Sequence, residues 1–106
     1  EIVKEEAMKA MEPFKIEFVS VDWWTLYSIG QRGAETFQYK DRVLLAGDAA
    51  HTHSSGAAQG MNTGVHDAVN LAWKLGGVLK GWYKPQVLQT YSPERRAIAQ
   101  HLIKLD

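Results

Sequence analysis

The chain has 106 residues, which fits one small domain, and its 12 basic residues balance its 12 acidic ones. This balance gives no electrostatic reason to expect nucleic acid or an anionic membrane as a partner, and the absence of cysteine excludes a disulfide framework and a thiol nucleophile. No apolar run is long enough to cross a bilayer and the first residues do not form a signal peptide, so the sequence predicts a soluble cytoplasmic protein.

The N-terminal part of the chain is predicted to form one helix and then strands. Apolar residues spaced among charges indicate a short helix over 1–11, which Pro13 stops because proline pushes the preceding residue out of the α region. Residues 14–18 alternate apolar and polar side chains, as in a half-buried strand. The alternation changes phase near Val19, where a β-bulge would reconcile the two halves. Aromatic and β-branched residues continue the β-structure over 24–29.

Four side chains in and after this region carry two interpretations each. Trp23, Trp24 and Tyr27 could line a pocket for an aromatic substrate. Aromatic side chains in strands more often belong to a core, so we expect the core position. For Arg32 the sequence leaves open whether it faces an active site or lies in a solvated or interdomain position.

The middle of the chain combines a strand, an acidic turn and a glycine-rich loop. Residues 43–46 are a continuous apolar run, typical of a strand covered on both faces. Gly47 ends the run and Asp48 follows at once, which places a carboxylate at the end of a strand where open α/β sheets bind ligands. The glycines within 56–64 allow close backbone approach, and the helix after them offers unpaired N–H groups and a positive dipole end. This order predicts a site for a polar cofactor.

Two helices are predicted in the C-terminal part. The first runs from a cap at Asn62 or Thr63 to about Lys80, and Gly81 closes it. Its buried face is expected to carry small and apolar side chains at helical spacing, namely Val65, Ala68, Val69, Ala72, Gly76 and Leu79.

A short helical turn is predicted after Pro85, and Ser92 has the position of an N-cap for the last helix, with Pro93 at its first residue. The apolar stripe of this helix is expected to consist of Ile98, Leu102 and Leu105. Trp73, Arg95 and Arg96 are expected to be structural.

These motifs resemble the class A FAD-dependent aromatic monooxygenases, and most closely the phenol 2-monooxygenase (phenol hydroxylase) family. Residues 47–51, Gly-Asp-Ala-Ala-His, match the second FAD-binding motif of that family, and residues 59–62, Gln-Gly-Met-Asn, match its flavin loop. The likeness extends along the whole chain and includes Asp-Trp-Trp at 22–24 and Asn-Leu-Ala-Trp-Lys-Leu at 70–75.

The resemblance implies an α/β fold: a segment of an FAD-binding doubly wound fold of the aromatic hydroxylase type, with strands from the adjoining substrate domain. Residues 1–40 would be the end of the substrate-binding β-sheet domain. Residues 41–106 would be the C-terminal part of the FAD-binding domain. Because the family's G-x-G-x-x-G and mid-chain Asp-Gly motifs do not occur in the sequence, we expect one segment of a larger flavoprotein.

The resemblance also implies which residues bind the cofactor. The Asp48 carboxylate would accept a hydrogen bond from a hydroxyl of the FAD ribityl chain. The backbone N–H groups of residues 60–62 would meet flavin N1 and the C2 carbonyl, where reduced flavin carries negative charge. The full implied set is Gly47, Asp48, Ser55, Gln59, Gly60, Met61 and Asn62. No catalytic residue is assigned, since the partner of a phenol is expected upstream.

The loop before the helix departs from the family pattern at two positions. Ser55 stands where the phenol hydroxylase pattern has proline, which bears on the stiffness of the loop and on oxygen transfer. Ala57-Ala58 replaces the usual Ala-Gly or Gly-Gly. A left-handed backbone at Ala58 would cost roughly 1–2 kcal/mol, so we expect the loop to follow a slightly different path.

Asp48, His51 and His53, with His66 from the helix, are conceivable metal ligands. Their spacing fits no familiar zinc pattern, and the resemblance accounts for both loop histidines without a metal. We therefore expect no metal and expect the histidines to brace the loop. Ser54 and Ser55 do not lie in a G-x-S-x-G elbow, which argues against a serine hydrolase.

The resemblance implies NAD(P)H- and O2-dependent hydroxylation of a phenolic or related aromatic compound through a flavin C4a-hydroperoxide, with FAD as cofactor. A related flavoprotein oxygenase of secondary metabolism (epoxidation, decarboxylation) and a non-catalytic flavin-binding homologue remain alternatives. The expected partners are a small aromatic substrate, O2 and the remainder of the same flavoprotein, and a homodimer is left open.

Overall fold

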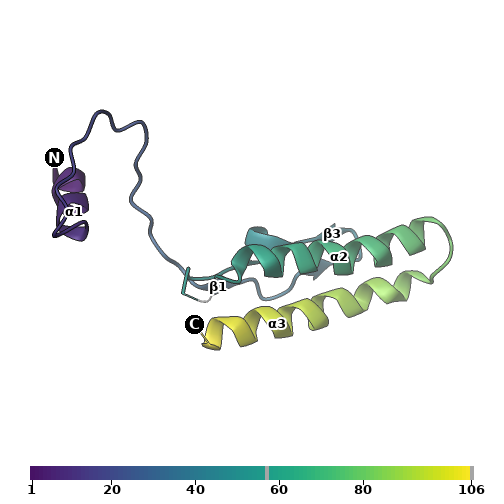
Figure 1. The fold of residues 1–106 in the computed structure, drawn as a ribbon. Coiled ribbons are helices and arrows are strands. Elements are labelled where there is room, and N and C mark those ends of the chain that lie inside the picture. Colours follow the sequence, from purple (N-terminus) through teal and green to yellow (C-terminus); the bar gives the residue numbers. More distant parts are fainter. Residues whose placement is uncertain (57, 106) are drawn as a thin grey trace.

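The computed structural model describes residues 1–56 and 58–105, which form an N-terminal arm and a body (Figure 1). The arm consists of α1 (Ile2–Ala10) and the segment that follows it, and it extends away from the body. The predicted first helix and its end before Pro13 are thus confirmed. None of the described helices combines the length and the apolar character needed to cross a membrane.

Two short strand pairs form one side of the body. β2 (Gln38–Tyr39) and β3 (Val43–Leu44) make an antiparallel hairpin with Gln38 opposite Leu44. β1 (Arg32–Gly33) pairs antiparallel with β4 (His51–Thr52), with Arg32 opposite Thr52. The 3-10 helix η1 (Gly47–Ala49) connects the two pairs, so the Gly-Asp motif follows a strand, as predicted.

Two long helices form the other side. α2 (Gly60–Leu79) and α3 (Tyr91–Leu105) run antiparallel beside each other, as Figure 1 shows, and η2 (Pro85–Thr90) leads into α3. α2 ends where predicted, because Gly81 takes a left-handed φ of 73° just beyond it. The predicted helical turn after Pro85 is also confirmed.

The core lies between the hairpin and α3. It consists of Phe37, Ala50, Tyr91 and Ala99, with Leu44 and Leu45 packed against them. The Tyr91 hydroxyl donates to the Leu45 carbonyl at 2.7 Å. Burial, and next the charge of Asp67, raise the pKa of Tyr91 to about 12, so the hydroxyl stays a neutral donor.

The strands predicted between 14 and 29 are not observed. No strand occurs in this range, and the side chains of Trp23, Trp24 and Tyr27 are 79%, 63% and 66% exposed, so the expected core position is wrong. A strand needs a neighbour for its N–H and C=O groups, and no described segment pairs with this range. The apolar run 43–46 is likewise a strand only at its first two residues, with Val43 exposed, so it is not covered on both faces.

Both predicted helix caps are wrong by a few residues. α2 starts at Gly60, and its N-cap is Gln59. Thr63 already lies in the first turn, where its hydroxyl donates to the Gln59 carbonyl at 2.8 Å. α3 starts at Tyr91, directly after η2, and the Ser92 hydroxyl accepts the Phe37 N–H at 3.0 Å. Neither hydroxyl caps its helix in the predicted way, because each bonds a different backbone group.

The predicted buried face of α2 is wrong. Val65 and Val69 are exposed, and the buried residues of the helix are Thr63, Asp67, Lys74 and Gly77. Asp67 and Lys74 form ion pairs with residues of α3, and these pairs compensate the loss of hydration of the two buried side chains. In α3, Ile98 and Leu105 are exposed and Leu102 is half-buried, so its apolar stripe is confirmed only in part.

Candidate functional site

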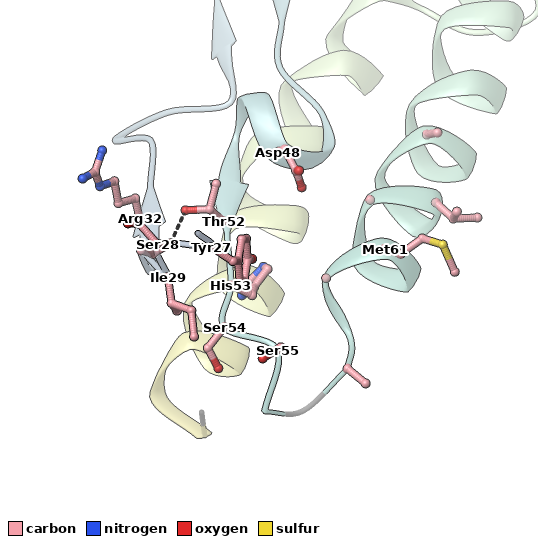
Figure 2. A pocket seen from close by; sticks show the side chains of 16 residues that line it. Tyr27, Ser28, Ile29, Arg32, Asp48, Thr52, His53, Ser54, Ser55 and Met61 are labelled. Carbon is pink, nitrogen blue, oxygen red and sulfur yellow. Dashed lines mark hydrogen bonds between the residues drawn. The ribbon is translucent and has the colours of Figure 1, made fainter. Parts of the chain in front are cut away.

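An open cleft of about 1080 Å³ lies between the end of the arm, η1, the loop after β4 and the start of α2 (Figure 2). One wall carries Tyr27, Thr52 and His53, and the opposite wall carries Met61 and its neighbours on α2. The Thr52 hydroxyl donates to the Gly30 carbonyl at 2.6 Å, which ties the arm's end to β4.

Asp48 projects from η1 into the space between these walls (Figure 2). Gly47 before it has a φ of 59°, a backbone conformation suited to glycine. A side-chain carbon on Gly64 would lie 3.3 Å from the Gly47 Cα atom, so two glycines let the Gly-Asp turn sit directly on α2. The close approach puts an exposed carboxylate beside the first turns of that helix.

The structure brings four of the seven predicted cofactor residues to the cleft: Asp48, Ser55, Gly60 and Met61. The other three, Gly47, Gln59 and Asn62, adjoin them in the chain without lining the cleft in its described part. The N–H groups of residues 60–62 have no acceptor within the helix, whereas the Thr63 N–H donates to the Gln59 carbonyl at 2.9 Å. The Gln59 side chain does not cap the helix, and the helix start borders the same cleft as Asp48.

The loop between β4 and α2 keeps the unusual backbone that the family pattern suggests. Ala58 lines the cleft with a left-handed φ of 51°, so the expected change of path is wrong at this residue. The Ala58 N–H donates to the Ser55 carbonyl at 3.2 Å, and the Gly56 N–H donates to the Ser54 hydroxyl at 3.1 Å. Ala57 lies outside the described residues.

The two loop histidines form a buried chain that reaches the cleft wall at His53. His51 Nδ1 lies 2.6 Å from His53 Nε2, and His51 Nε2 lies 2.6 Å from Asp67 Oδ2. These contacts tie β4 and the start of the following loop to α2, as expected for histidines that brace the loop. Among the described residues, no three His, Cys, Asp or Glu side chains gather in a way that could hold a metal ion.

Asp67 was not singled out from the sequence, yet it is the most connected carboxylate of the body. Its side chain is fully buried and accepts from Arg95 Nε at 2.7 Å and from the Gly47 N–H at 3.0 Å, besides His51. Burial favours the neutral acid, but these hydrogen bonds outweigh burial and hold the pKa of Asp67 below its ordinary value. Arg95 is thus structural, as expected.

Tyr27 and Arg32 line the cleft at the end of the arm. In Figure 2 the Arg32 guanidinium points away from Asp48 and Met61, toward the outside of the cleft. Trp23 and Trp24 do not line this cleft. Of the aromatic residues considered for a substrate pocket, Tyr27 alone among the described residues reaches it.

Comparison with known proteins shows which family the chain resembles. A model described as an FAD binding domain matches residues 2–106. FAD-dependent monooxygenase hkm7 of Aspergillus hancockii is 42% identical over all of this chain and 20% of its own length. Phenol 2-monooxygenase fsqG of Aspergillus fumigatus is 45% identical over 94% of this chain and 17% of its own length.

Comparison with solved structures points to the same family. The rebeccamycin biosynthetic enzyme RebC with reduced flavin superposes with a TM-score of 0.68 at 45% identity, over 72% of this chain and 14% of the RebC chain. This confirms the predicted α/β segment of an FAD-binding fold of the aromatic hydroxylase type. The chain spans about a fifth of the length of the two curated relatives. It belongs to the FAD binding domain family, which includes the FAD-dependent aromatic monooxygenases that its sequence resembles.

Proposed function

We propose that this chain forms one side of the flavin site in an FAD-dependent monooxygenase that hydroxylates a phenolic or related aromatic compound with NAD(P)H and O2. The observation that carries the proposal is the cleft in which the Asp48 carboxylate projects beside the first turn of α2 (Figure 2). A carboxylate acceptor and a set of unpaired N–H donors are what a ribityl chain and an electron-rich ring edge need.

The residues of the cleft suit a flavin in shape as well as in chemistry. Gly60 and Gly64 leave the start of α2 free of side chains at two positions. The Met61 side chain is 80% exposed and can move aside. Asp48 would accept from a ribityl hydroxyl, and the N–H groups of residues 60–62 would donate to the pyrimidine edge. Gly47, Ser55 and Gln59 would shape the loops on either side.

When bound, FAD supplies the redox and oxygen-activating chemistry. The chain contributes the orientation of the ring and the electrostatic environment of its pyrimidine edge. A helix start stabilises a nearby negative charge by about 0.3 to 2 kcal/mol, and 2 kcal/mol corresponds to roughly 40 mV in a two-electron potential. The start of α2 therefore tunes the reduction of the cofactor and does not account for catalysis alone.

The domain boundary is part of the proposal. Residues 1–40 would belong to the end of a substrate-binding domain and residues 41–106 to the FAD-binding domain. The separation of α1 from the body in Figure 1 supports a division of the chain, but β1, β2 and the core residue Phe37 belong to the body, which favours a boundary before residue 32. The exposed aromatic side chains of the arm also support it, because they suit contact with further protein or substrate.

The phenolic substrate class is supported by the relative named phenol 2-monooxygenase and by Tyr27 at the cleft. A second candidate is a different flavin-dependent oxidation in biosynthesis, favoured by the similarity to the rebeccamycin biosynthetic enzyme RebC. The two candidates differ in their product, since hydroxylation adds one oxygen atom to an intact ring.

The test is a visible spectrum of the full-length protein, followed by NADPH and NADH oxidation with a panel of phenols and mass analysis of the products. We expect bound flavin and products heavier by one oxygen atom. Flavin with ring-altered or decarboxylated products would favour the second candidate. A protein without flavin, or with flavin that no nicotinamide reduces, would contradict the proposed monooxygenase.

A further inference from the structure

Asp67 joins four elements of the body through one buried carboxylate. Oδ2 accepts from the Gly47 N–H of η1 and lies 2.6 Å from His51 of β4, and Oδ1 accepts from Arg95 of α3. Asp67 itself lies on α2. These partners fill both of its oxygens, so the carboxylate fixes the positions of three neighbouring elements relative to α2.

Two of these contacts lead to the cleft. Gly47 immediately precedes Asp48, so the hydrogen bond to Asp67 holds the turn that carries the cleft carboxylate. His51 links Asp67 to His53, because its Nε2 lies 2.6 Å from Asp67 Oδ2 and its Nδ1 lies 2.6 Å from His53 Nε2. Because His53 lines the cleft, Asp67 is linked both to the turn that carries Asp48 and to one wall of the cleft.

Stability alone does not explain this arrangement. A buried ion pair is weak support for stability, because apolar side chains of similar volume often replace it without loss. The carboxylate also fixes the positions of its partners, since each hydrogen bond requires its donor at a defined distance and angle.

We propose that Asp67 is a positioning residue of the flavin site, which holds Asp48 through Gly47 and the cleft wall through His51 and His53. The inference rests on the proposed function, because it concerns the same cleft. It adds a residue that touches neither the cleft nor its ligand and acts through the residues that do.

The chain offers a matched control. Lys74 of α2 donates to Glu94 of α3 at 2.6 Å, so this ion pair joins the same two helices as Asp67 and Arg95. Neither Lys74 nor Glu94 lines the cleft or contacts the described residues of the Gly-Asp turn. Glu94→Gln therefore weakens the helix pair and leaves the cleft as it is.

The experiment measures FAD dissociation constants and melting temperatures of the full-length protein for Asp67→Asn, Glu94→Gln and Asp48→Ala. Asparagine keeps the size of Asp67 but loses the charge and one acceptor. We expect Asp67→Asn to weaken FAD binding about tenfold, the effect of one charged hydrogen bond, and Glu94→Gln less than about twofold. In the double variant with Asp48→Ala, the two effects should be less than additive, because both act through Asp48.

An equal effect of Asp67→Asn and Glu94→Gln on FAD binding, or strict additivity with Asp48→Ala, would overturn the inference. If Asp67→Asn does not fold, His51→Leu decides in the same way, since leucine has no polar side-chain atom that could link Asp67 to His53. Unchanged FAD binding in Asp48→Ala would instead contradict the proposed site, so the two failures are distinguishable.

Discussion

Asp48 lies in the Gly-Asp turn and Asp67 accepts a hydrogen bond from that turn, but the two carboxylates have opposite surroundings. Asp48 is exposed at the cleft, where its oxygens are open to a ligand. Asp67 is fully buried, and protein donors from three elements occupy its oxygens. A carboxylate with its partners already in place can only position its neighbours, whereas an exposed one can bind. This difference in burial supports the separate roles proposed for the two residues.

A testable prediction at the residue scale concerns Ala58. Its left-handed backbone costs an alanine roughly 1–2 kcal/mol, and glycine gives back about 0.4–1 kcal/mol through the entropy of the unfolded chain. Ala58→Gly should therefore raise the free energy of unfolding by about 0.5–1 kcal/mol. Urea unfolding of the full-length protein measures it. The control Ala72→Gly, in the middle of α2, should lower it by about 1 kcal/mol. Equal signs for the two variants would refute the strain at Ala58.

At the scale of elements, α2 is held to α3 by polar contacts more than by an apolar stripe. Asp67 pairs with Arg95 and, two turns later, Lys74 pairs with Glu94. Asn70 donates to the same Glu94 carboxylate at 2.9 Å. Val65, Val69 and Leu79 of α2 are exposed, although Leu71 packs against the core.

The turn after α2 depends on one of two adjacent glycines. A Cβ atom on Gly77 would overlap the ring of Tyr83, whereas one on Gly76 would meet nothing within 4 Å. Gly77→Ala should lower the free energy of unfolding by about 1–3 kcal/mol. Gly76→Ala should be neutral or stabilising by up to about 1 kcal/mol because alanine favours the helix. Chemical unfolding of both variants checks the contrast, and similar values would show that Tyr83 does not pack there.

At the scale of the molecule, acid should weaken the body through Asp67. Its pKa in the folded state lies below the ordinary 3.8, so the ionised carboxylate favours the fold. That contribution is complete above 3.8 and is lost as the pH falls through the lower folded-state pKa. The free energy of unfolding should therefore fall with acid less steeply in Asp67→Asn than in the natural protein. The exposed Asp22→Asn serves as control, and parallel curves for all three proteins would contradict this.

The sequence predicted the features that depend on local chemistry. The end of α2 at Gly81, the turn after Pro85 and the place of the Gly-Asp motif follow from backbone preferences of glycine and proline, and all three are confirmed. Of these features, the Gly-Asp motif together with the family resemblance predicted where the cleft lies.

What depends on distant partners was not predicted. Periodicity assigned the apolar side of α2 to the interior, because it registers hydrophobicity and cannot register that Asp67 would meet Arg95, 28 residues away. The strands expected in 14–29 failed for a related reason, since alternation does not supply the neighbouring strand that a sheet requires. The Ser92 hydroxyl likewise bonds Phe37, 55 residues away, instead of capping its own helix.

The central claim is that a flavin lies between Asp48 and the first turn of α2. Amide hydrogen exchange of the full-length protein with and without FAD tests it most directly, because bound flavin would occupy those N–H groups. We predict protection of residues 47–49 and 60–62 on FAD binding, and unchanged exchange at the hairpin turn of Lys40 and Asp41. Protection confined to other parts of the protein, with residues 60–62 exchanging as before, would contradict the claim.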